Sequence, residues 1–400
     1  MAEYHLICDE CGFNTKEDAY YILCPRCKGM LDVVLDNSLS ERLIDKNKKS
    51  IFKYHNMMPF EASPEFCSYE NYEDSPEFVD HHLSELLDVE LVVKDETVLP
   101  TGTWKDREGF IAIYRLLKNK INDLMVFSSG NTGSAIARSA SIIKGPRVHL
   151  VVPLASKERL SHVSKFYDPN YVKLNFFDGS NDECIREAKR KAIQDKIVVE
   201  GGFENYARRE GLKLLGLEHI FNGVAGIDWY AQPVAGGIGI YSFYKAYTDC
   251  GLEPPKILGV QAAICDPMVR AYKDNADVLD RKYIPTSVVP SDLVRVLRTR
   301  DPGSAYSRLK KIIDRVGGGF ESVNDYEILN GLRLFYHSDY FLSRYHDDGV
   351  LVGLEPATAL AGIIKYINSG IITKGSKVLL NVSGAAKYGD VQLHWIEDLI

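Results

Sequence analysis

From about residue 70 onward, short β-rich runs alternate with segments of helical periodicity, and this alternation limits the folds open to the chain. The β-rich run 89–95 precedes a helical segment at 106–120, and the run 123–130 precedes another at 131–145. Such alternation, with helices of about 10–15 residues, is typical of βαβ units and a largely parallel sheet. We therefore predict an α/β fold whose ligands bind at loops beyond the carboxyl ends of the strands. Further β-rich runs lie at 147–153, 228–236, 257–263 and 377–384.

The length and composition indicate a globular protein of more than one domain. The 400 residues include 45% hydrophobic and 26% charged residues, which is ordinary for a folded protein. The formal net charge of -7 argues against nucleic-acid binding through a broad basic surface. No apolar stretch approaches the roughly 20 residues that span a bilayer, and the N-terminus lacks the pattern of a secretory signal. We expect a cytoplasmic protein without a membrane partner.

The first 35 residues contain two Cys-x-x-Cys pairs, Cys8 with Cys11 and Cys24 with Cys27, separated by twelve residues. This spacing is typical of a zinc ribbon, and four thiolates would leave the metal no open position for catalysis. We predict a structural zinc site; the alternative is a ribbon that ordinary packing holds without metal. The scattered remaining cysteines are expected to be reduced core residues: Cys67, Cys184, Cys250 and Cys265.

Three strand-to-helix turns carry residues suited to chemistry. In LPTGTWKDR (99–107), Lys105 follows a Pro/Gly turn at the start of a helix. In SSGNTG (128–133), small residues and the N–H groups of a helix N-terminus suit an anion such as a carboxylate. In AGGIG (235–239), main-chain N–H groups could cradle a phosphate. Each motif alone has an ordinary alternative: a surface lysine, a capped turn or a tight glycine turn.

Taken together and in order, these segments resemble threonine synthase and, more broadly, the fold-type II pyridoxal-phosphate enzymes. The resemblance extends from about residue 75 to residue 390. LPTGTWKDR is similar to the family's Asn-Pro-Thr-Gly-Ser-Phe-Lys-Asp-Arg, and SSGNTG matches its substrate and cofactor loop. Further landmarks follow in the family's order at 205–211 (NYARREG), 259–262 (GVQA) and 354–357 (LEPA).

The resemblance implies two α/β domains that close on the cofactor, preceded by the ribbon. We expect the zinc-ribbon-like segment at 1–35. A large domain that binds pyridoxal phosphate is expected at 36–104 and 201–400, and a small domain with the substrate carboxylate loop at 105–200. A homodimer is the expected assembly.

Individual roles also follow from the resemblance. Lys105 would hold pyridoxal 5'-phosphate as a Schiff base and later move protons at the substrate's α-carbon. Asn131 would hydrogen-bond the cofactor's ring hydroxyl, and Ser383 would face its pyridine nitrogen, which favours elimination and replacement over transamination. The cofactor phosphate would be bound by Gly236, Gly237 and Gly239. The substrate would be bound by Thr103, Ser129, Gly130 and Thr132.

The chain departs from the family pattern at several positions. Leu99, Trp104 and Glu108 stand where Asn, Phe and Gly are usual, and 383–390 reads SGAAKYGD where the family has a segment containing Thr-Gly-His-Gly. Glu108 would either alter the pocket beside Lys105 or face solvent. These departures leave the exact substrate open.

Three functions remain open at this point. The resemblance favours a threonine synthase, which converts O-phospho-L-homoserine and water to L-threonine and phosphate. A β-replacement synthase on O-phosphoserine, like cysteate synthase, is the second possibility. The third is a non-catalytic interaction protein with a zinc ribbon on a retired enzyme fold, against which the intact Lys105 and Asn131 argue.

Overall fold

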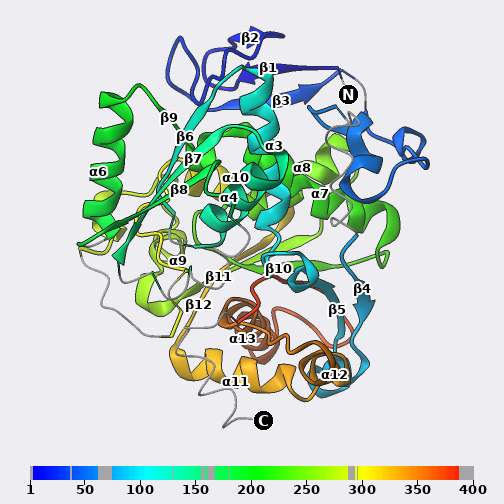
Figure 1. Cartoon of the computed structure of the whole chain (residues 1–400). Helices are drawn as coiled ribbons and strands as arrows, with labels where there is room; N and C mark the ends of the chain where they lie inside the picture. The colour runs from blue at the N-terminus through cyan, green and yellow to red at the C-terminus, as the bar shows by residue number, and fades with distance from the viewer. Residues whose placement is uncertain are drawn as a thin grey trace. The chain divides into compact units, whose positions relative to one another are not determined.

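A computed structural model describes residues 3–36, 38–61, 74–128, 130–154, 157, 160, 167–179, 181–286, 293–294 and 296–386. It contains three sheets with the strand orders β2-β1-β3, β12-β11-β10-β13-β5-β4 and β8-β7-β6-β9 (Figure 1). The predicted α/β class is confirmed. Two compact units are present. Unit 1 comprises Met1–Asp74, Leu99–Leu217 and Asp249–Leu252, and unit 2 comprises Ser75–Val98, Glu218–Thr248 and Glu253–Ile400.

The N-terminal ribbon of unit 1 is a small antiparallel sheet. Strand β1 (Tyr4–Cys8) pairs with β2 (Asn14–Thr15) on one side and with β3 (Leu31–Leu35) on the other. Its buried cluster consists of Cys8, Cys24 and Leu31, with Phe13 and Tyr21 packed against it. The ribbon has further buried apolar residues outside this cluster, among them Leu6 and Val33. Two 3-10 helices follow, η1 (Glu41–Leu43) and η2 (Ser50–Met57).

The remainder of unit 1 is built on a four-stranded parallel sheet. Its strands are β6 (Asp123–Val126), β7 (Arg147–Pro153), β8 (Val172–Phe177) and β9 (Val198–Val199). Its helices are α3 (Lys105–Lys118), α4 (Asn131–Ile143), α6 (Asn181–Gln194), η5 (Gly202–Glu204) and α7 (Tyr206–Asn222), the last of which continues into unit 2.

Two glycines let the helices of unit 1 approach one another closely. A Cβ on Gly109 of α3 would lie 2.6 Å from the carbonyl oxygen of Ala135 in α4. A Cβ on Gly211 of α7 would lie 2.6 Å from the Cα of Glu108 in α3. Real Cβ atoms do not come this close to backbone, so helices α4 and α7 pack against α3 at separations that only glycine permits.

Unit 2 is built on a six-stranded sheet that is parallel except for its edge strand β4. The inner strands are near-continuous apolar runs, as expected for a sheet with both faces covered. The strands are β4 (Glu77–Val79), β5 (Glu90–Asp95), β10 (Trp229–Pro233), β11 (Lys256–Ala262), β12 (Gly318–Val323) and β13 (Lys377–Val382).

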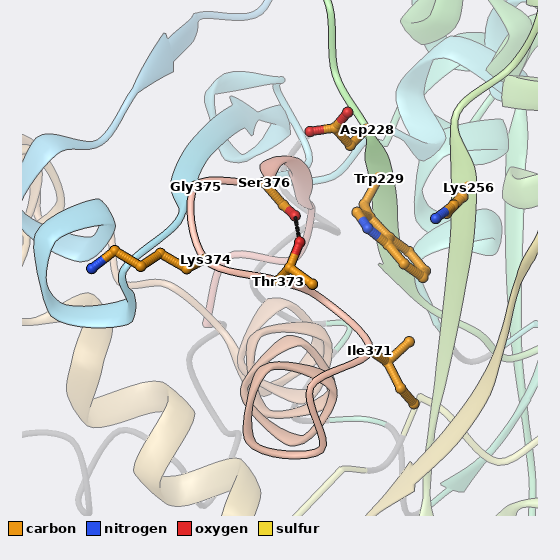
Figure 2. Close-up of a pocket in the computed structure, with 8 residues that line it drawn as sticks. All are labelled: Asp228, Trp229, Lys256, Ile371, Thr373, Lys374, Gly375 and Ser376. Carbon is orange, nitrogen blue, oxygen red and sulfur yellow. Dashed lines mark hydrogen bonds between the residues drawn. The ribbon is translucent and has the colours of Figure 1, made fainter.

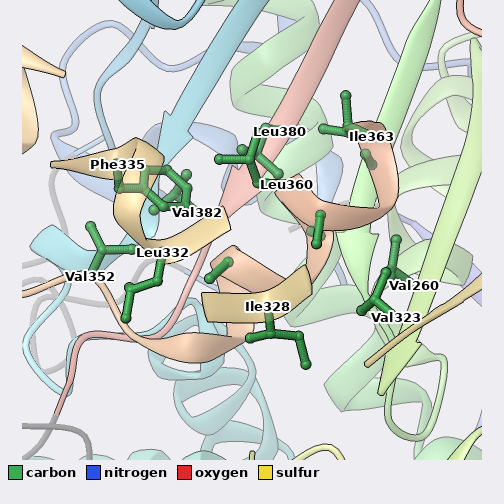
Figure 3. Packing of buried hydrophobic residues seen from close by; sticks show 14 of the residues in the cluster. Val260, Val323, Ile328, Leu332, Phe335, Val352, Leu360, Ile363, Leu380 and Val382 are labelled. Atoms are coloured by element: carbon green, nitrogen blue, oxygen red, sulfur yellow. The ribbon is translucent and has the colours of Figure 1, made fainter. Parts of the chain in front are cut away.

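The main core of unit 2 lies where α11 (Asp325–Phe335) and α13 (Leu354–Asn368) pack together and α13 packs on β10, β11 and β13. Figure 3 shows Leu332 and Phe335 of α11 close to Val382 of β13. A capping box, in which Asn324 and Glu327 each bond the other's backbone N–H, begins α11. The other helices are α2 (His81–Leu87), η3 (Glu96–Val98), α8 (Ile238–Asp249), η6 (Ala263–Cys265), α9 (Pro267–Lys273), η7 (Arg281–Tyr283), α10 (Ala305–Val316) and α12 (Asp339–Asp348).

The predicted elements agree with the structure to within a few residues. The expected strand at 89–95 is β5, and the expected helix at 106–120 is α3. None of the helices in the described part of the chain has both the length and the apolar character to cross a membrane.

Candidate active site

Lys105 is the first residue of α3 and is held by the turn that precedes it. Gly102, with a φ of 73°, donates its N–H to the carbonyl of Leu99 and forms the tight bend. The N–H of Thr101 donates to the Asp106 carboxylate at 2.7 Å, and the N–H of Lys105 donates to the hydroxyl of Thr103 at 3.3 Å. The side chain of Lys105 is largely buried, with 17% of its surface exposed.

The amine of Lys105 faces a buried carboxylate. Its Nζ lies 3.5 Å from Oε2 of Glu108, whose side chain is fully buried, and 5.3 Å from the centre of the Trp104 ring. Burial lowers the pKa of the Lys105 amine below its ordinary value, and the charge of Glu108 offsets part of that decrease. The positive end of the α3 dipole acts in the same direction as burial. The neutral form of the Lys105 amine is therefore populated at a lower pH than the neutral form of an exposed lysine.

Glu108 belongs to a network that joins four segments of unit 1. Its Oε1 accepts hydrogen bonds from the hydroxyl of Thr132 at 2.8 Å and from a guanidinium nitrogen of Arg208 at 3.0 Å. A second nitrogen of Arg208 donates to Glu200 at 2.7 Å. Burial raises the pKa of Glu108, but the charges of Arg208 and Lys105 lower it by a larger amount. The pKa of Glu108 therefore lies below the ordinary carboxyl value. Glu108 is therefore ionised at neutral pH.

The loop expected to bind the substrate carboxylate leads into α4, which begins at Asn131. Gly130 is the N-cap, and a Cβ on Gly133 would lie 2.2 Å from the carbonyl oxygen of Ser128, so the loop folds closely over the first turn. The first N–H groups of this 13-residue helix have no partner within the helix and favour an anion. Ser129 lies outside the described residues.

Unit 2 carries the glycine turn and Ser383 at the carboxyl ends of neighbouring parallel strands. Gly236 and Gly237 follow β10 and precede α8, and Ser383 follows β13, which pairs with β10. A Cβ on Gly236 would meet nothing within 4 Å, so that position borders open space. Gly237 has a φ of 82°, and its Cβ would lie 2.5 Å from Cδ1 of Leu309. Gly239 lies in the first turn of α8 and is buried.

These features fit pyridoxal phosphate. In unit 1, the lysine amine of lowered pKa suits the aldehyde; in unit 2, the open space beside a glycine turn at the start of a 12-residue helix suits the phosphate. The structure brings Lys105, Thr103 and Thr132 together in unit 1, and it places the glycine turn and Ser383 at one edge of the unit 2 sheet.

Sequence reasoning missed the network around Glu108. The alternative that Glu108 faces solvent is wrong, because its side chain is fully buried. The sequence pattern marks Arg208 only as part of the segment 205–211, and no pattern marks Glu200. Their charges were the available signal, but nothing in the sequence shows which charged residues a fold buries together.

The hydroxyl of Thr132 is already used within the protein. It donates to Glu108 at 2.8 Å and lies 3.0 Å from a guanidinium nitrogen of Arg208, which donates to it. The prediction that Thr132 binds a substrate carboxylate is therefore supported only by its position at the start of α4.

The four N-terminal cysteines converge. Their sulfur atoms all lie within 4.8 Å of one another, and Cys8 to Cys27 and Cys11 to Cys24 are each 3.5 Å apart. Four sulfurs about 2.3 Å from a zinc ion would stand roughly 3.8 Å apart. The backbone N–H of Gly29 donates to the sulfur of Cys27, as in turns that orient thiolate ligands. The arrangement suits a tetrahedral zinc ion.

A separate shallow cavity of about 370 Å³ lies at the opposite end of the unit 2 sheet (Figure 2). It borders Trp229 at the start of β10, Lys256 at the start of β11 and the turn before β13. Because the glycine turn and Ser383 lie at the carboxyl ends of these strands, this cavity is not the candidate active site.

Comparison with known proteins agrees with this geometry. The family model described as Pyridoxal-phosphate dependent enzyme matches residues 76–384. A threonine synthase from Methanosarcina acetivorans is 28% identical over 393 residues, covering 95% of this chain and 91% of the relative. A cysteate synthase from Methanocorpusculum labreanum is 25% identical over 401 residues, covering 96% and 93%.

Solved structures show the same fold. The processed form of threonine deaminase isoform 2 from Solanum lycopersicum superposes with a TM-score of 0.66 at 19% identity, covering 84% of this chain and 85% of that chain. Maize serine racemase superposes with a TM-score of 0.62 at 17% identity, covering 82% and 92%. With the family match spanning more than half of its length, the chain belongs to the pyridoxal-phosphate dependent enzymes and is related to threonine synthase and cysteate synthase.

Proposed function

We propose that this enzyme acts on a phosphorylated amino acid and converts O-phospho-L-homoserine and water to L-threonine and phosphate. The observation that carries the proposal is the placement of Lys105 at the start of α3, with its amine held among Trp104, Glu108 and the network that reaches α4. The full-length similarity to a threonine synthase supports the choice of reaction.

The residues of this chain would position the reactants and move one proton. Lys105 would hold the cofactor and exchange a proton with the substrate's α-carbon, for which its lowered pKa is suited. Asn131 would hydrogen-bond the ring hydroxyl, and Ser383 would face the ring nitrogen. When bound, pyridoxal phosphate supplies the electron sink for the carbanion. Gly236, Gly237 and Gly239 would present N–H groups to its phosphate.

The start of α4 would bind the substrate. The N–H groups of its first turn, which have no partner within the helix, and the positive end of the helix dipole favour the amino-acid carboxylate. Gly130, Thr132 and Ser129 would form this site, with Thr103 on the turn before α3. Fixing the carboxylate orients the α-carbon toward the amine that moves its proton.

A β-replacement on O-phosphoserine is the second candidate. Trp104 and Glu108 both lie against the Lys105 amine and are larger than the family's usual Phe and Gly. The smaller space that remains would suit a substrate one methylene shorter than phosphohomoserine. The similarity to cysteate synthases over nearly the whole chain supports this candidate.

Separate incubation with the two phosphorylated amino acids tests the proposal. Purified enzyme with added pyridoxal phosphate is given O-phospho-L-homoserine or O-phospho-L-serine with sulfite, and inorganic phosphate and the product amino acid are measured. Release of phosphate with formation of threonine supports the first candidate. Phosphate released only from phosphoserine would replace it by the second, and no release from either would reject both.

We also propose that Cys8, Cys11, Cys24 and Cys27 hold a structural zinc ion. The support is the convergence of four sulfurs around one point.

A further inference from the structure

We propose that Glu108 is the counter-ion of the Lys105 nitrogen and stabilises the positive charge that this nitrogen carries, both when it is linked to the cofactor and when it has accepted a proton. This inference rests on the proposed role of Lys105. Glu108 stands where the family usually has glycine, so the proposed counter-ion is a feature of this chain.

The two oxygens of Glu108 have different partners. Oε1 accepts from Thr132 and Arg208, at 2.8 and 3.0 Å. Oε2 lies 3.5 Å from the nitrogen of Lys105. An acid that served only to pair Arg208 would not need its other oxygen beside the lysine. The bonds to Oε1 hold the carboxylate in place, so Oε2 stays at Lys105 whether or not the lysine is charged.

Three charged side chains in the described part of unit 1 act on the Lys105 amine, and together they carry one net negative charge. Glu108 from α3 and Glu200 from the segment before η5 contribute two negative charges, and Arg208 from α7 contributes one positive charge. The sum is -1, and a positive nitrogen on Lys105 makes the cluster neutral. Thr132, which joins the network from α4, is uncharged. Without Glu108, burial and the helix dipole would both oppose a positive charge on this nitrogen.

Glu108 does not compete for the proton. The charges of Arg208 and Lys105 hold its pKa below the ordinary carboxyl value despite burial. The proton that Lys105 takes from a substrate carbon therefore stays on the lysine nitrogen, and the carboxylate balances the new charge. This arrangement keeps the proton where it can be returned to the substrate.

The first experiment is a pH titration of the visible cofactor band in the holoenzyme. Glu108→Gln keeps the shape of the side chain but removes its charge. In this variant, we expect the visible band that depends on a positively charged Lys105 nitrogen to disappear at a pH about 1–3 units lower than in the wild type. Glu108→Asp keeps the charge and should restore part of this shift. Glu200→Gln removes a charge that is bound to Arg208, and its shift should be less than half as large.

Arg208→Gln supplies a test with the opposite sign. Arg208 lowers the affinity of Lys105 for its proton, so its removal should move the titration to higher pH. A purely structural role for the network predicts no such reversal. Opposite shifts in Glu108→Gln and Arg208→Gln would support the inference. An unchanged midpoint in Glu108→Gln, or shifts of the same sign in both variants, would overturn it.

A second measurement separates this inference from the proposed function. Competitive acetylation of the full chain without cofactor, followed by peptide mapping, reports the titration of the Lys105 amine directly. The same order of midpoints is expected, with Arg208→Gln above wild type and Glu108→Gln below it. If borohydride reduction of the wild type with cofactor labels no peptide containing Lys105, the proposed function fails, while the acetylation series still decides whether Glu108 is the counter-ion.

Discussion

Asp18 of the N-terminal ribbon and Arg115 near the end of α3 form a buried bidentate ion pair. Nε and Nη2 of Arg115 each lie 2.8 Å from a different oxygen of Asp18, and both side chains are at most 3% exposed. The hydroxyl of Tyr206, the first residue of α7, also donates to Asp18 at 2.6 Å. A third nitrogen of Arg115 donates to Asn205. The ribbon is therefore attached to the two helices that carry Lys105 and Arg208.

Asp18→Asn should destabilise the protein strongly. Removing one partner leaves the charge of Arg115 buried without its counter-ion, which typically costs about 3–5 kcal/mol. Chemical denaturation at neutral pH measures the change. Asp123→Asn is the matched control, because Asp123 pairs with Arg147 on the surface, where the arginine is 50% exposed. We expect that control to lose less than about 1 kcal/mol. Equal losses of unfolding free energy in the two variants would contradict the conclusion that Asp18 is the buried counter-ion of Arg115.

The contribution of Asp18 should depend on pH in a defined direction. Burial raises the pKa of Asp18, but the hydrogen bond and charge of Arg115 lower it more strongly, so the folded value lies below the ordinary one. A carboxyl with a lowered pKa stabilises the fold above its unfolded pKa of about 3.9 and loses that effect as pH falls through the folded value. The difference in unfolding free energy between wild type and Asp18→Asn should thus be constant above about pH 5 and shrink below about pH 4. A difference that grows in acid would contradict this sign.

Replacing Cys8 and Cys11 together with serine should release zinc. Two of the four converging sulfurs are lost, and the remaining pair cannot form a closed tetrahedral site. Metal analysis should fall from about one zinc per chain to none. We expect the cofactor spectrum to persist, because the expected cofactor residues lie outside the ribbon. Cys250→Ser, outside the cluster, is the control and should keep its zinc. Loss of the cofactor band in the double variant would mean that the ribbon shapes the core.

The sequence was sufficient where a pattern is local. The apolar run at 377–384 is β13, and the turn 99–107 places Lys105 at the start of α3 as predicted. Strand β12 was missed because Gly318–Val323 begins with two glycines, and Gly318 has a φ of 113°. Such a segment has only one β-branched residue, Val323, and so gives a weak strand signal.

Long-range pairing was beyond the sequence. Asp18 and Arg115 are 97 positions apart, and Glu108 and Arg208 are 100 apart. Which charges meet depends on how α3 and α7 pack, and that packing depends on Gly211, whose Cβ would strike the backbone of α3. No local pattern encodes such a contact.

Lys105→Ala should abolish turnover and leave the fold intact. The variant loses both the link to the cofactor and the group that moves the α-proton, so we expect a decrease in kcat of at least about 1000-fold. Circular dichroism should be unchanged, because the side chain is partly exposed and its one ion pair in the described structure is with Glu108, at 3.5 Å. Lys118→Ala, at the other end of α3, is the control and should keep its activity. Retained turnover in Lys105→Ala would reject the assignment.

The two glycines of the expected phosphate turn should respond differently to alanine. Gly236 borders open space, so Gly236→Ala should fold normally while its methyl group enters the volume expected for the cofactor phosphate. We expect weaker binding of pyridoxal phosphate at unchanged unfolding free energy without cofactor. Gly237 has a φ of 82°, and its Cβ would lie 2.5 Å from Leu309, so Gly237→Ala should cost about 1–3 kcal/mol of stability even without cofactor. Cofactor titration and denaturation of the cofactor-free chain distinguish the two effects. If Gly236→Ala binds the cofactor as well as the wild type does, the phosphate lies elsewhere, because no ligand could share the space that the new methyl group occupies.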